Sequence, residues 1–392
     1  MKRFFQIIYR EIRLLSTNLI MLGMLFGAPI VYSVLIGFVY KDAKVNDLPV
    51  VVIDEDNSPL SHAIIDGLDD NEYMKVADVR FQMTNMQLEV ATENYHAVVI
   101  IPQGFEADIN QNRHPEIRVD VNSANMLTAN YVSTGVMQVL GTFNAGIEIK
   151  GLQKHGLPAD VAAKSYEAFH LKVTRFFNPS SNYLYFLLPG MLGTIMQQVF
   201  LMVVALSFAR ECENRSFPDL FKFSKSPLVL LLGKAIPYWV LGMLVWLPLI
   251  RLTFGYFHIP MFENMGAYWL ISGLFVLSLT FAGIAVSVLL RTQLQATEVL
   301  MVLAAPGFII SGQTWPLQQM PEWVQSLAAV IPLTHYTEAF RKLLMIDLNI
   351  SQLHAQIMPL LYITAISFVF AWIVLHFRVR LAKKRIAACE KD

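Results

Sequence analysis

The sequence predicts a polytopic α-helical membrane protein with six transmembrane helices and an extracytoplasmic α/β domain inserted between the first and second of them. Two observations lead to this fold class. Of the 392 residues, 55% are hydrophobic and only 15% are charged, whereas soluble domains usually carry about 25% charged residues. In addition, residues 41–182 hold 11 Lys and Arg against 19 Asp and Glu, and the rest of the chain holds 19 against 11. An acidic segment within a basic, apolar chain indicates two compartments.

Residues 1–18 are predicted to form a cytoplasmic amphipathic helix. Apolar side chains can share one broad face of it, and charged ones occupy much of the remaining surface, which is the pattern of a helix lying along a membrane surface. The apolar set is Phe4, Ile7, Ile8, Ile12 and Leu15, and the charged set is Lys2, Arg3, Arg10, Glu11 and Arg13.

The first transmembrane helix is predicted over 19–40, because Leu19–Val39 contains no charge and a bilayer core needs roughly 20 apolar residues. The basic residues before it resemble the start of a signal peptide. However, the apolar run is too long for one, and Val39-Tyr40-Lys41 is too bulky for a cleavage site. We therefore expect an uncleaved anchor.

The extracytoplasmic domain is predicted over 41–182 as a small mixed sheet with helices. Val50–Ile53 and Ala97–Ile101 are short apolar runs typical of buried strands, and "EIRVDVN" alternates as a third strand does. Ser58-Pro59 begins a helix after the first strand, and another helix begins near Phe105. A long helical stretch then follows, Leu127–Lys150.

An acidic run, Asp54-Glu55-Asp56, ends the first of these strands. A calcium loop counted from Asp54 would need glycine at its sixth position and glutamate at its twelfth. Pro59 and Ile65 stand there instead. We therefore interpret the run as a solvated turn and predict no metal site.

Region 183–377 supplies five further predicted spans, from the apolar runs Tyr183–Ala209, Leu228–Phe254, Ala267–Leu290, Val299–Gly312 and Gln356–Phe377. The fourth of them has only fourteen residues and could be re-entrant. It reaches span length only by including Gln295 to Glu298. The outer segment 313–350 is predicted to be re-entrant or amphipathic.

The distribution of basic residues predicts the orientation. The N-terminal segment and the 209–225 loop each hold four Lys and Arg, the tail 378–392 holds six, and the loop 255–266 holds none. The positive-inside rule therefore places both termini and the 209–225 loop in the cytoplasm and residues 41–182 outside. Two termini on the same side require an even number of spans, so the weak run also counts as a span and the total is six. Cys212 and Cys389 then lie on the reducing side and show no disulfide or metal pattern.

Sequence motifs of catalysis and of nucleotide binding are absent: there is no GxxxxGK[ST], GxSxG, HExxH or GxGxxG. The chain is therefore not expected to be an enzyme. His335, Glu338 and Arg341 can share one helical face in "PLTHYTEAFR". We interpret them as a structural polar cluster that orients an outer helix, in preference to a catalytic set.

The loop "RECENRSFPDLFKFSK" carries seven charged residues in sixteen positions, together with Phe217, Leu220, Phe221 and Phe223. One alternative is that the loop only connects two helices at the level of the lipid headgroups. Such a loop needs basic residues, and the acidic residues Glu211, Glu213 and Asp219 fit that role poorly. Mixed charge with an aromatic anchor is typical of a docking surface for a protein partner.

These motifs resemble those of the ABC type 2 exporter permeases, in the bacterial drug-export-like branch with a large first periplasmic loop. The family carries "RE-x-E-x-G-T" after the second span and "SPL…LGK" entering the third. The matching residues are Arg210, Glu211, Glu213, Ser226, Pro227, Leu228, Gly233 and Lys234. Arg215-Ser216 replaces the Gly-Thr pair, and Pro218 interrupts the short helix. Met320–Leu343 and, more weakly, Asn178–Gly190 also match.

The resemblance implies an ATP-driven exporter in the bacterial inner membrane, moving a drug-like or lipophilic molecule outward as in multidrug efflux. The loop 209–226 would couple to a separate ATPase subunit, which holds the ATP and Mg, so no cofactor is expected in this chain. The implied coupling residues are Arg210, Glu211, Glu213, Phe217, Leu220 and Phe221. Within this set, Glu213 and Phe217 share a helical face and are expected in the contact, whereas Glu211 is expected to pair with Arg215.

The implied partners are a second permease copy or a sister permease, which would form a dimer, and the lipid bilayer. The outer domain would offer a surface to a periplasmic adaptor or form part of the exit route. No nucleic acid is expected. Two alternatives stay open: a secondary transporter, whose spans usually carry deep ionisable residues, and a membrane-anchored sensor whose outer domain binds a ligand.

Overall fold

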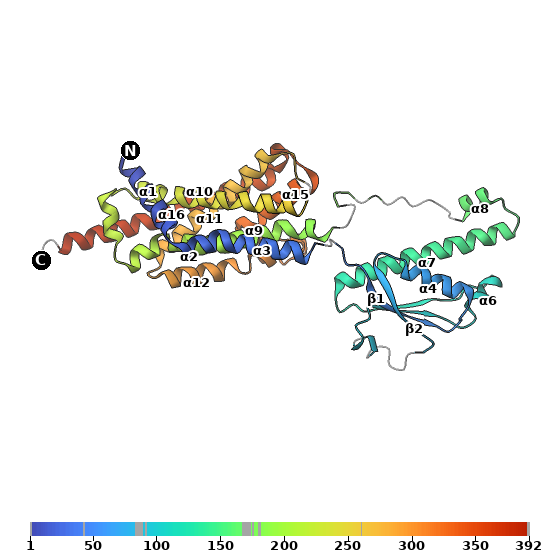
Figure 1. Ribbon diagram of the computed structural model, residues 1–392. Coiled ribbons are helices and arrows are strands. Elements are labelled where there is room, and N and C mark those ends of the chain that lie inside the picture. The colour runs from blue at the N-terminus through green and yellow to red at the C-terminus, as the bar shows by residue number, and fades with distance from the viewer. Residues whose placement is uncertain are drawn as a thin grey trace. The chain divides into compact units, whose positions relative to one another are not determined.

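The structure is a computed structural model that describes residues 2–41, 44–82, 89–90, 92–166, 174, 176–178, 182–259 and 261–389. The chain divides into two compact units (Figure 1). The sheet unit is Lys44–Thr174, and the span unit combines Met1–Ala43 with Arg175–Asp392.

The sheet unit contains a four-stranded mixed sheet with the order β2-β1-β3-β4. Its strands are β1 (Leu48–Asp54), β2 (Met74–Arg80), β3 (Ala97–Ile101) and β4 (Arg118–Val121). Strand β1 is parallel to both β2 and β3, and β4 is antiparallel to β3. The central strands β1 and β3 are apolar runs buried on both faces, which is the environment that β-branched residues favour.

Helices of the sheet unit are α4 (Pro59–Asp69), α6 (Phe105–Asn110), α7 (Met126–Lys154) and α8 (Ala159–Ser165). Helix α4 begins where the sequence predicts, because the Ser58 side chain accepts a hydrogen bond from the backbone N–H of Ser61, and the Ser61 hydroxyl accepts one from the N–H of Ser58. Figure 1 shows α4 and α7 along the sheet. Residues of both helices pack with β1 and β3 in one hydrophobic core.

The acidic turn after β1 is held by internal hydrogen bonds. Asp54 is buried, and its carboxylate accepts hydrogen bonds from the Ser61 hydroxyl at 2.7 Å and from the backbone N–H groups of Asn57 at 2.9 Å and Asp56 at 3.1 Å. In the part of the chain that the structure describes, no three His, Cys, Asp or Glu residues gather as they would to hold a metal ion.

Asp54→Ala is expected to destabilise the sheet unit by about 1.5–3 kcal/mol, because hydrogen bonds to a buried charged group contribute on that order. The measurement is urea unfolding of residues 41–182 expressed alone. Glu55→Ala, at the exposed neighbouring position, is the control and should change stability by less than about 0.5 kcal/mol. Adding a chelator should leave the melting temperature unchanged. A lower melting temperature would show that this turn binds calcium or another metal ion.

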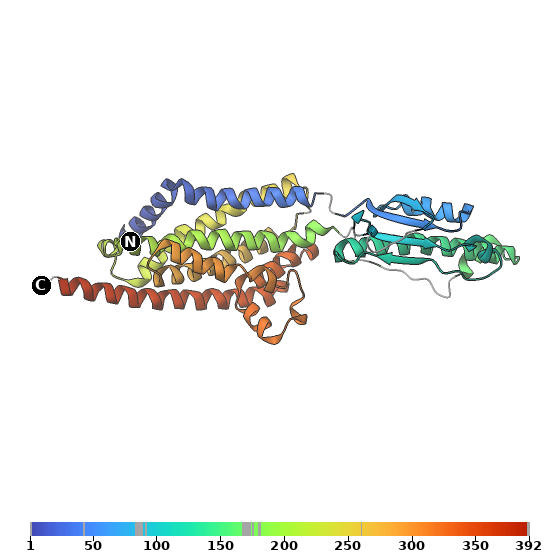
Figure 2. The ribbon, with the colours of Figure 1, turned by 90° about the horizontal axis from the view of Figure 1, so that it is seen from below.

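The span unit contains six helices long and apolar enough to cross a membrane among its described residues. They are Leu19–Val39, Tyr183–Glu213, Pro227–Tyr256, Met265–Leu289, Gln293–Ile310 and Ile350–Lys384. The prediction of six spans is confirmed, including the weak fifth one, whose helix begins at Gln293 and so includes residues 295–298. Figures 1 and 2 show the spans of this unit running side by side.

Several spans are assembled from consecutive shorter helices. The first consists of α2 (Leu19–Leu22), the π-helix η1 (Gly23–Gly27) and α3 (Ala28–Val39). The second is α9 (Tyr183–Glu213), and the third is α10 (Pro227–Ile250) with the π-helix η3 (Arg251–Tyr256). The fourth is α11 (Met265–Leu289), the fifth is α12 (Gln293–Ala304) with α13 (Gly307–Ile310), and the sixth lies in η5 (Ile350–Leu353) and α16 (His354–Cys389).

Shorter elements lie at both ends of the spans. They are α1 (Lys2–Thr17), the 3-10 helices η2 (Phe217–Lys222) and η4 (Leu317–Gln319), α14 (Glu322–Ala329) and α15 (Pro332–Ile346). Figure 2 shows α1 (dark blue) inclined to the line of α2 and α3. Within the predicted amphipathic pattern of α1, Glu11 is buried and does not lie on the polar surface, and Ile12 is 49% exposed.

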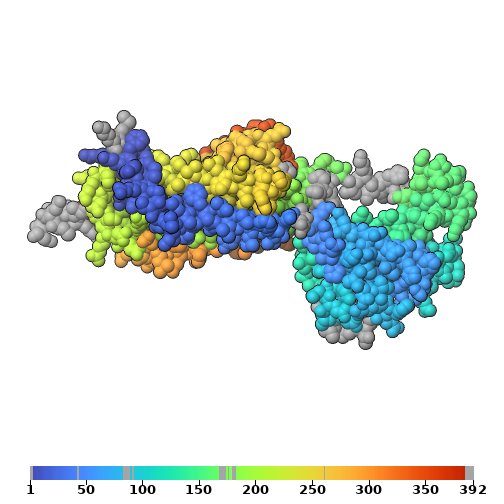
Figure 3. All heavy atoms as spheres, viewed as in Figure 1, coloured from blue at the N-terminus to red at the C-terminus, as the bar shows by residue number. Residues whose placement is uncertain are grey.

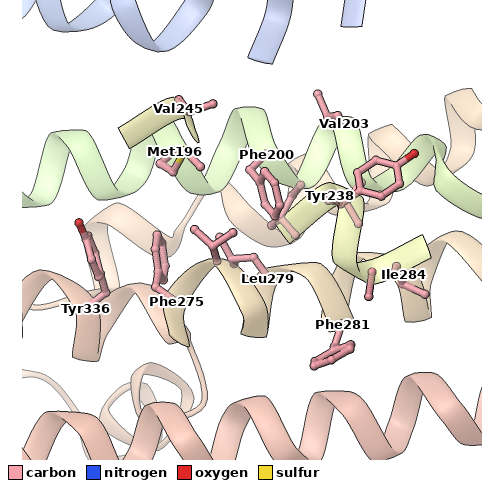
Figure 4. Close-up of a cluster of buried hydrophobic side chains, with 14 of the residues drawn as sticks. Met196, Phe200, Val203, Tyr238, Val245, Phe275, Leu279, Phe281, Ile284 and Tyr336 are labelled. Carbon is pink, nitrogen blue, oxygen red and sulfur yellow. The ribbon is translucent and has the colours of Figure 1, made fainter. Parts of the chain in front are cut away.

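The core of the span unit lies around α9 and α11, the two spans that the others cover most completely. Figure 4 shows Phe200, Tyr238, Phe275 and Tyr336 among the side chains that fill the space between the helices. The rings of Phe275 and Tyr336 stack with their centroids 4.3 Å apart. The outer helix α15 is thereby packed into the same core as the spans.

One polar contact joins α9 and α11 inside this core. The Ser287 hydroxyl accepts hydrogen bonds from the backbone N–H groups of Phe208 and Ala209, both at 2.9 Å, and donates one to the backbone carbonyl of Ala205 at 2.6 Å. A polar side chain buried in an apolar bundle is stable only when it is satisfied in this way.

Candidate functional site

The loop between α9 and α10 is the segment with the predicted coupling residues, and the structure gives it a definite shape. Helix α9 ends at Glu213, and Arg215 adopts a φ of +55°. This left-handed conformation favours glycine, which the resembling motif carries at that position. The predicted short coupling helix is the six-residue 3-10 helix η2, in which Pro218 is the second residue.

Phe217 and Leu220 are buried within the chain. The ring of Phe217 contacts Phe208 of α9, with centroids 6.1 Å apart, and Phe221, with centroids 5.9 Å apart. These side chains therefore anchor the loop to the bundle. The exposed residues of the loop form a surface that we call the loop surface. Its members are Asn214, Arg215, Pro218, Asp219, Lys222 and Lys225. Asp219 and Lys222 form an ion pair at 2.7 Å within it.

Glu211 is 3% exposed and lies beneath the loop. Its carboxylate accepts hydrogen bonds from the two terminal nitrogens of Arg10, at 2.7 and 3.1 Å, and from the Ser216 hydroxyl. The predicted pairing of Glu211 with Arg215 is wrong. The left-handed turn at Arg215 takes that residue away from the α9 helix face, and α1 supplies the partner instead.

Lys234 of α10 completes the arrangement and is only 1% exposed. Its Nζ lies 2.9 Å from a carboxylate oxygen of Glu11, 3.2 Å from Glu211 and 2.7 Å from the backbone carbonyl of Ser207. The Nζ also lies 4.7 Å from the centroid of the Phe208 ring, a favourable distance for a cation over an aromatic face.

We call Arg10, Glu11, Glu211 and Lys234 the inner ion cluster. Arg10 also pairs with Glu11, at 3.2 Å, so each cation of the cluster contacts both carboxylates. Burial alone would lower the pKa of Arg10, but the hydrogen bond and the charge of Glu211 outweigh this and raise the pKa above its ordinary value. Two positive and two negative charges balance, which a buried ionic group requires. The cluster joins α1, α9 and α10.

The remaining predicted coupling residues lie around this cluster. Glu213 is exposed and accepts hydrogen bonds from the backbone N–H of Gln293 at 2.9 Å and from its side-chain amide at 3.0 Å. It therefore connects the end of α9 to the start of α12. Arg210 is half-buried, and Phe221 is half-buried against the core.

The predicted outer polar cluster has a different geometry from the one its spacing suggests. Glu338 pairs with Lys342 at 2.7 Å and accepts a hydrogen bond from Gln356 of α16 at 2.9 Å. The Nε2 of His335 lies 2.9 Å from the carbonyl of Ala329. Arg341 shares with Glu338 a small cavity of about 220 Å³. His335 thus contacts α14, Glu338 contacts α16, and Arg341 lines a cavity together with Glu338.

A family model for "ABC-2 family transporter protein" matches residues 20–375, which is nearly the whole chain. The chain belongs to the ABC-2 transporter family. It is a membrane permease of this family.

Individual relatives of this ABC-2 permease come from Escherichia coli K12. The chain is 27% identical over 195 residues to the "Probable multidrug ABC transporter permease YbhR", and 26% identical over 249 residues to the similarly named YbhS. These matches cover 50% and 63% of this chain, and 53% and 63% of the two relatives. The "Inner membrane transport permease YhhJ" is 23% identical over 390 residues, covering 96% of this chain and 97% of the relative.

Sequence reasoning missed the roles of Glu11 and Lys234. Glu11 is the only acidic residue in α1, and Lys234 stands in the apolar run of α10. A lone lysine in an apolar span is costly to bury without a partner of opposite charge, and α1 offers one carboxylate among its four basic residues. That cost was a signal that the two residues pair.

Proposed function

We propose that this ABC-2 permease moves a drug-like or lipophilic molecule outward across the bacterial inner membrane, driven by a separate ATPase subunit that docks on the loop surface. The names of YbhR and YbhS support the substrate class, and that of YhhJ supports the membrane. The termini and the loop then face the cytoplasm, and the sheet unit faces the periplasm, in keeping with the basic residues of these segments.

The observation that carries the proposal is the inner ion cluster. ATP is bound and hydrolysed on the partner, so the task of this chain is to carry a movement from the loop into the spans. Phe217 and Leu220 fix the loop to the bundle, and Ser216 ties it to Glu211. Through Arg10 and Lys234, a displacement of the loop reaches α1 and α10 together.

The path continues into the core through Ser287, which holds α11 to the α9 backbone a short way above Glu211. Three spans and the interfacial helix thus move as one body when the loop moves. Rigid-body rearrangement of packed helices is what alternating access requires. With only six spans, the permease is proposed to complete its pathway with a second copy or a sister permease.

The loop has two kinds of residue in this proposal, and none of the six residues predicted for coupling belongs to the loop surface. Glu211, Phe217 and Leu220 lie inside and transmit the movement. The direct contact with the ATPase falls to the loop surface, because its mixed charges are exposed.

Transport by inside-out membrane vesicles tests the proposal. Vesicles that contain this permease and its ATPase should accumulate a lipophilic fluorescent dye when ATP is added, because their cytoplasmic face is outside. A protonophore should leave this accumulation intact. Accumulation that requires the proton gradient but not ATP would instead identify a secondary transporter. If no lipophilic dye accumulated on addition of ATP, the proposed substrate class would be wrong.

A further inference from the structure

A groove of about 800 Å³ runs along α1 beside the loop after α9. We call it the α1 groove, and its lining is Phe5, Gln6, Tyr9, Arg10, Arg13, Leu14, Thr17 and Phe223. Figure 3 shows α1 (dark blue) on the surface of the span unit next to the yellow-green segment that contains this loop. The volume is within the range of pockets that hold whole small molecules, about 300–1,000 Å³.

The groove carries one uncompensated positive charge. Arg10 belongs to the inner ion cluster, where two carboxylates balance it. Arg13 is exposed and has no ion-pair partner among the described residues, and no acidic residue lines the groove. Gln6, Tyr9 and Thr17 add polar groups, while Phe5, Leu14 and Phe223 form apolar walls. The groove thus favours an anion attached to an apolar body.

The covalent chain fixes the level of the groove relative to the bilayer. Thr17 lines the groove, and the first span begins at Leu19. Arg13 stands six positions before Leu19. Four of these steps are helical at about 1.5 Å each, and the two through extended Asn18 span about 3.3 Å each, so Arg13 lies within about 13 Å of the start of the span. Headgroup layers are about 5–8 Å thick on each side of the hydrocarbon core. Because α1 is inclined to the line of α2 and α3 (Figure 2), the distance of Arg13 measured along the span is shorter than this, which puts Arg13 at the level of the headgroups. Exposed Leu19 and Ile20 continue from the groove along the span.

We propose that the α1 groove is a binding site for one anionic phospholipid. The phosphate lies between Arg13 and the Tyr9 hydroxyl, the glycerol region lies against Leu14 and Thr17, and the acyl chains follow Leu19 and Ile20. The site rests on the membrane placement of α1 and is independent of the substrate class proposed above. An acidic segment of the ATPase is the competing occupant. Apolar walls at headgroup depth fit a lipid better than a charged cytoplasmic protein segment.

Native mass spectrometry of the purified permease tests the site, with phosphatidylglycerol titrated in detergent. Arg13→Gln should weaken binding of the first lipid about fivefold or more, since each basic residue near a lipid surface contributes on the order of one kcal/mol. Arg3→Gln is the matched control, because Arg3 is an exposed arginine of the same helix that does not line the groove. Phosphatidylcholine should bind both variants and the wild type alike.

Each contrary outcome has a definite meaning. If Arg13→Gln and Arg3→Gln weakened lipid binding equally, the effect would be a general attraction of basic residues to the anionic lipid, and the proposed site would be wrong. Displacement of the lipid by millimolar inorganic phosphate would show a free-anion site instead. If Arg13→Gln released the co-purified ATPase and left lipid binding unchanged, the groove would belong to the ATPase. Because Arg13 is exposed, a normal gel-filtration profile is expected for both variants and serves as the folding check.

Discussion

Lys234→Met is expected to destabilise the span unit by about 3–5 kcal/mol, because breaking a buried ion pair leaves an uncompensated charge. In the variant, Glu11 and Glu211 would share Arg10 alone. We expect a large drop in the thermal unfolding temperature of the detergent-purified protein and loss of ATP-driven transport. Lys384→Met is the control, because Lys384 is an exposed lysine of the same unit that lies outside the loop surface and the inner ion cluster.

A second substitution separates charge balance from packing at this position. Lys234→Met combined with Glu11→Gln restores a neutral cluster of one arginine and one carboxylate, and methionine fills most of the lysine volume. We expect the double variant to recover most of the lost stability. If the single variant melted like the wild type, or if the double variant melted no higher than the single, the cluster would not hold the three helices together.

Exchanging the charges of Asp219 and Lys222 is expected to abolish co-purification of the ATPase. Asp219→Lys with Lys222→Asp keeps their ion pair within the loop, so the fold of the loop should survive. A docked partner would meet each charge with its sign reversed, and juxtaposed like charges cost several kcal/mol across an interface. Retention of the ATPase should therefore fall more than tenfold, and transport should fall with it.

Phe217→Ala is the contrasting variant for the loop. Removing a buried phenylalanine costs about 3–5 kcal/mol, so the loop should come away from α9 and the purified permease itself should melt earlier. The charge exchange should leave the melting temperature unchanged. If the ATPase still co-purified at wild-type yield after the exchange, the loop surface would not be its docking site, and the loop would only connect two helices at the level of the lipid headgroups.

The membrane fold was predictable because each span is a local property of the sequence. A run of about twenty apolar residues is sufficient evidence for a span, whatever lies elsewhere in the chain. The weak fifth span needed one more argument, the common side of the two termini, and that argument gave the correct number. The strands β1 and β3 and the start of α4 at Ser58 were likewise encoded locally.

The candidate site was less predictable because its contacts are distant in sequence. Arg10 and Glu211 are separated by 201 positions, and no periodicity relates them. The loop sequence also mixes two kinds of side chain. Phe217 and Leu220, three apart, are turned inward, while Pro218, Asp219 and Lys222 are turned outward. The sequence pattern of the loop alone therefore does not distinguish the buried residues, which transmit movement, from the exposed residues, which contact a partner.

The contact of Ser287 with α9 has a consequence for evolution. Its hydroxyl contacts only main-chain atoms of α9, and every amino acid except proline presents the same main-chain atoms. Mutations at positions 205, 208 and 209 can therefore accumulate without loss of this joint, provided that side-chain volume is kept. Position 287 itself has no such freedom, since only a small hydroxyl both accepts two N–H groups and donates to a carbonyl. Among diverging descendants of this gene, we expect position 287 to stay serine or threonine while positions 205 and 209 drift; Phe208 is held by its ring contacts with Phe217 and Lys234.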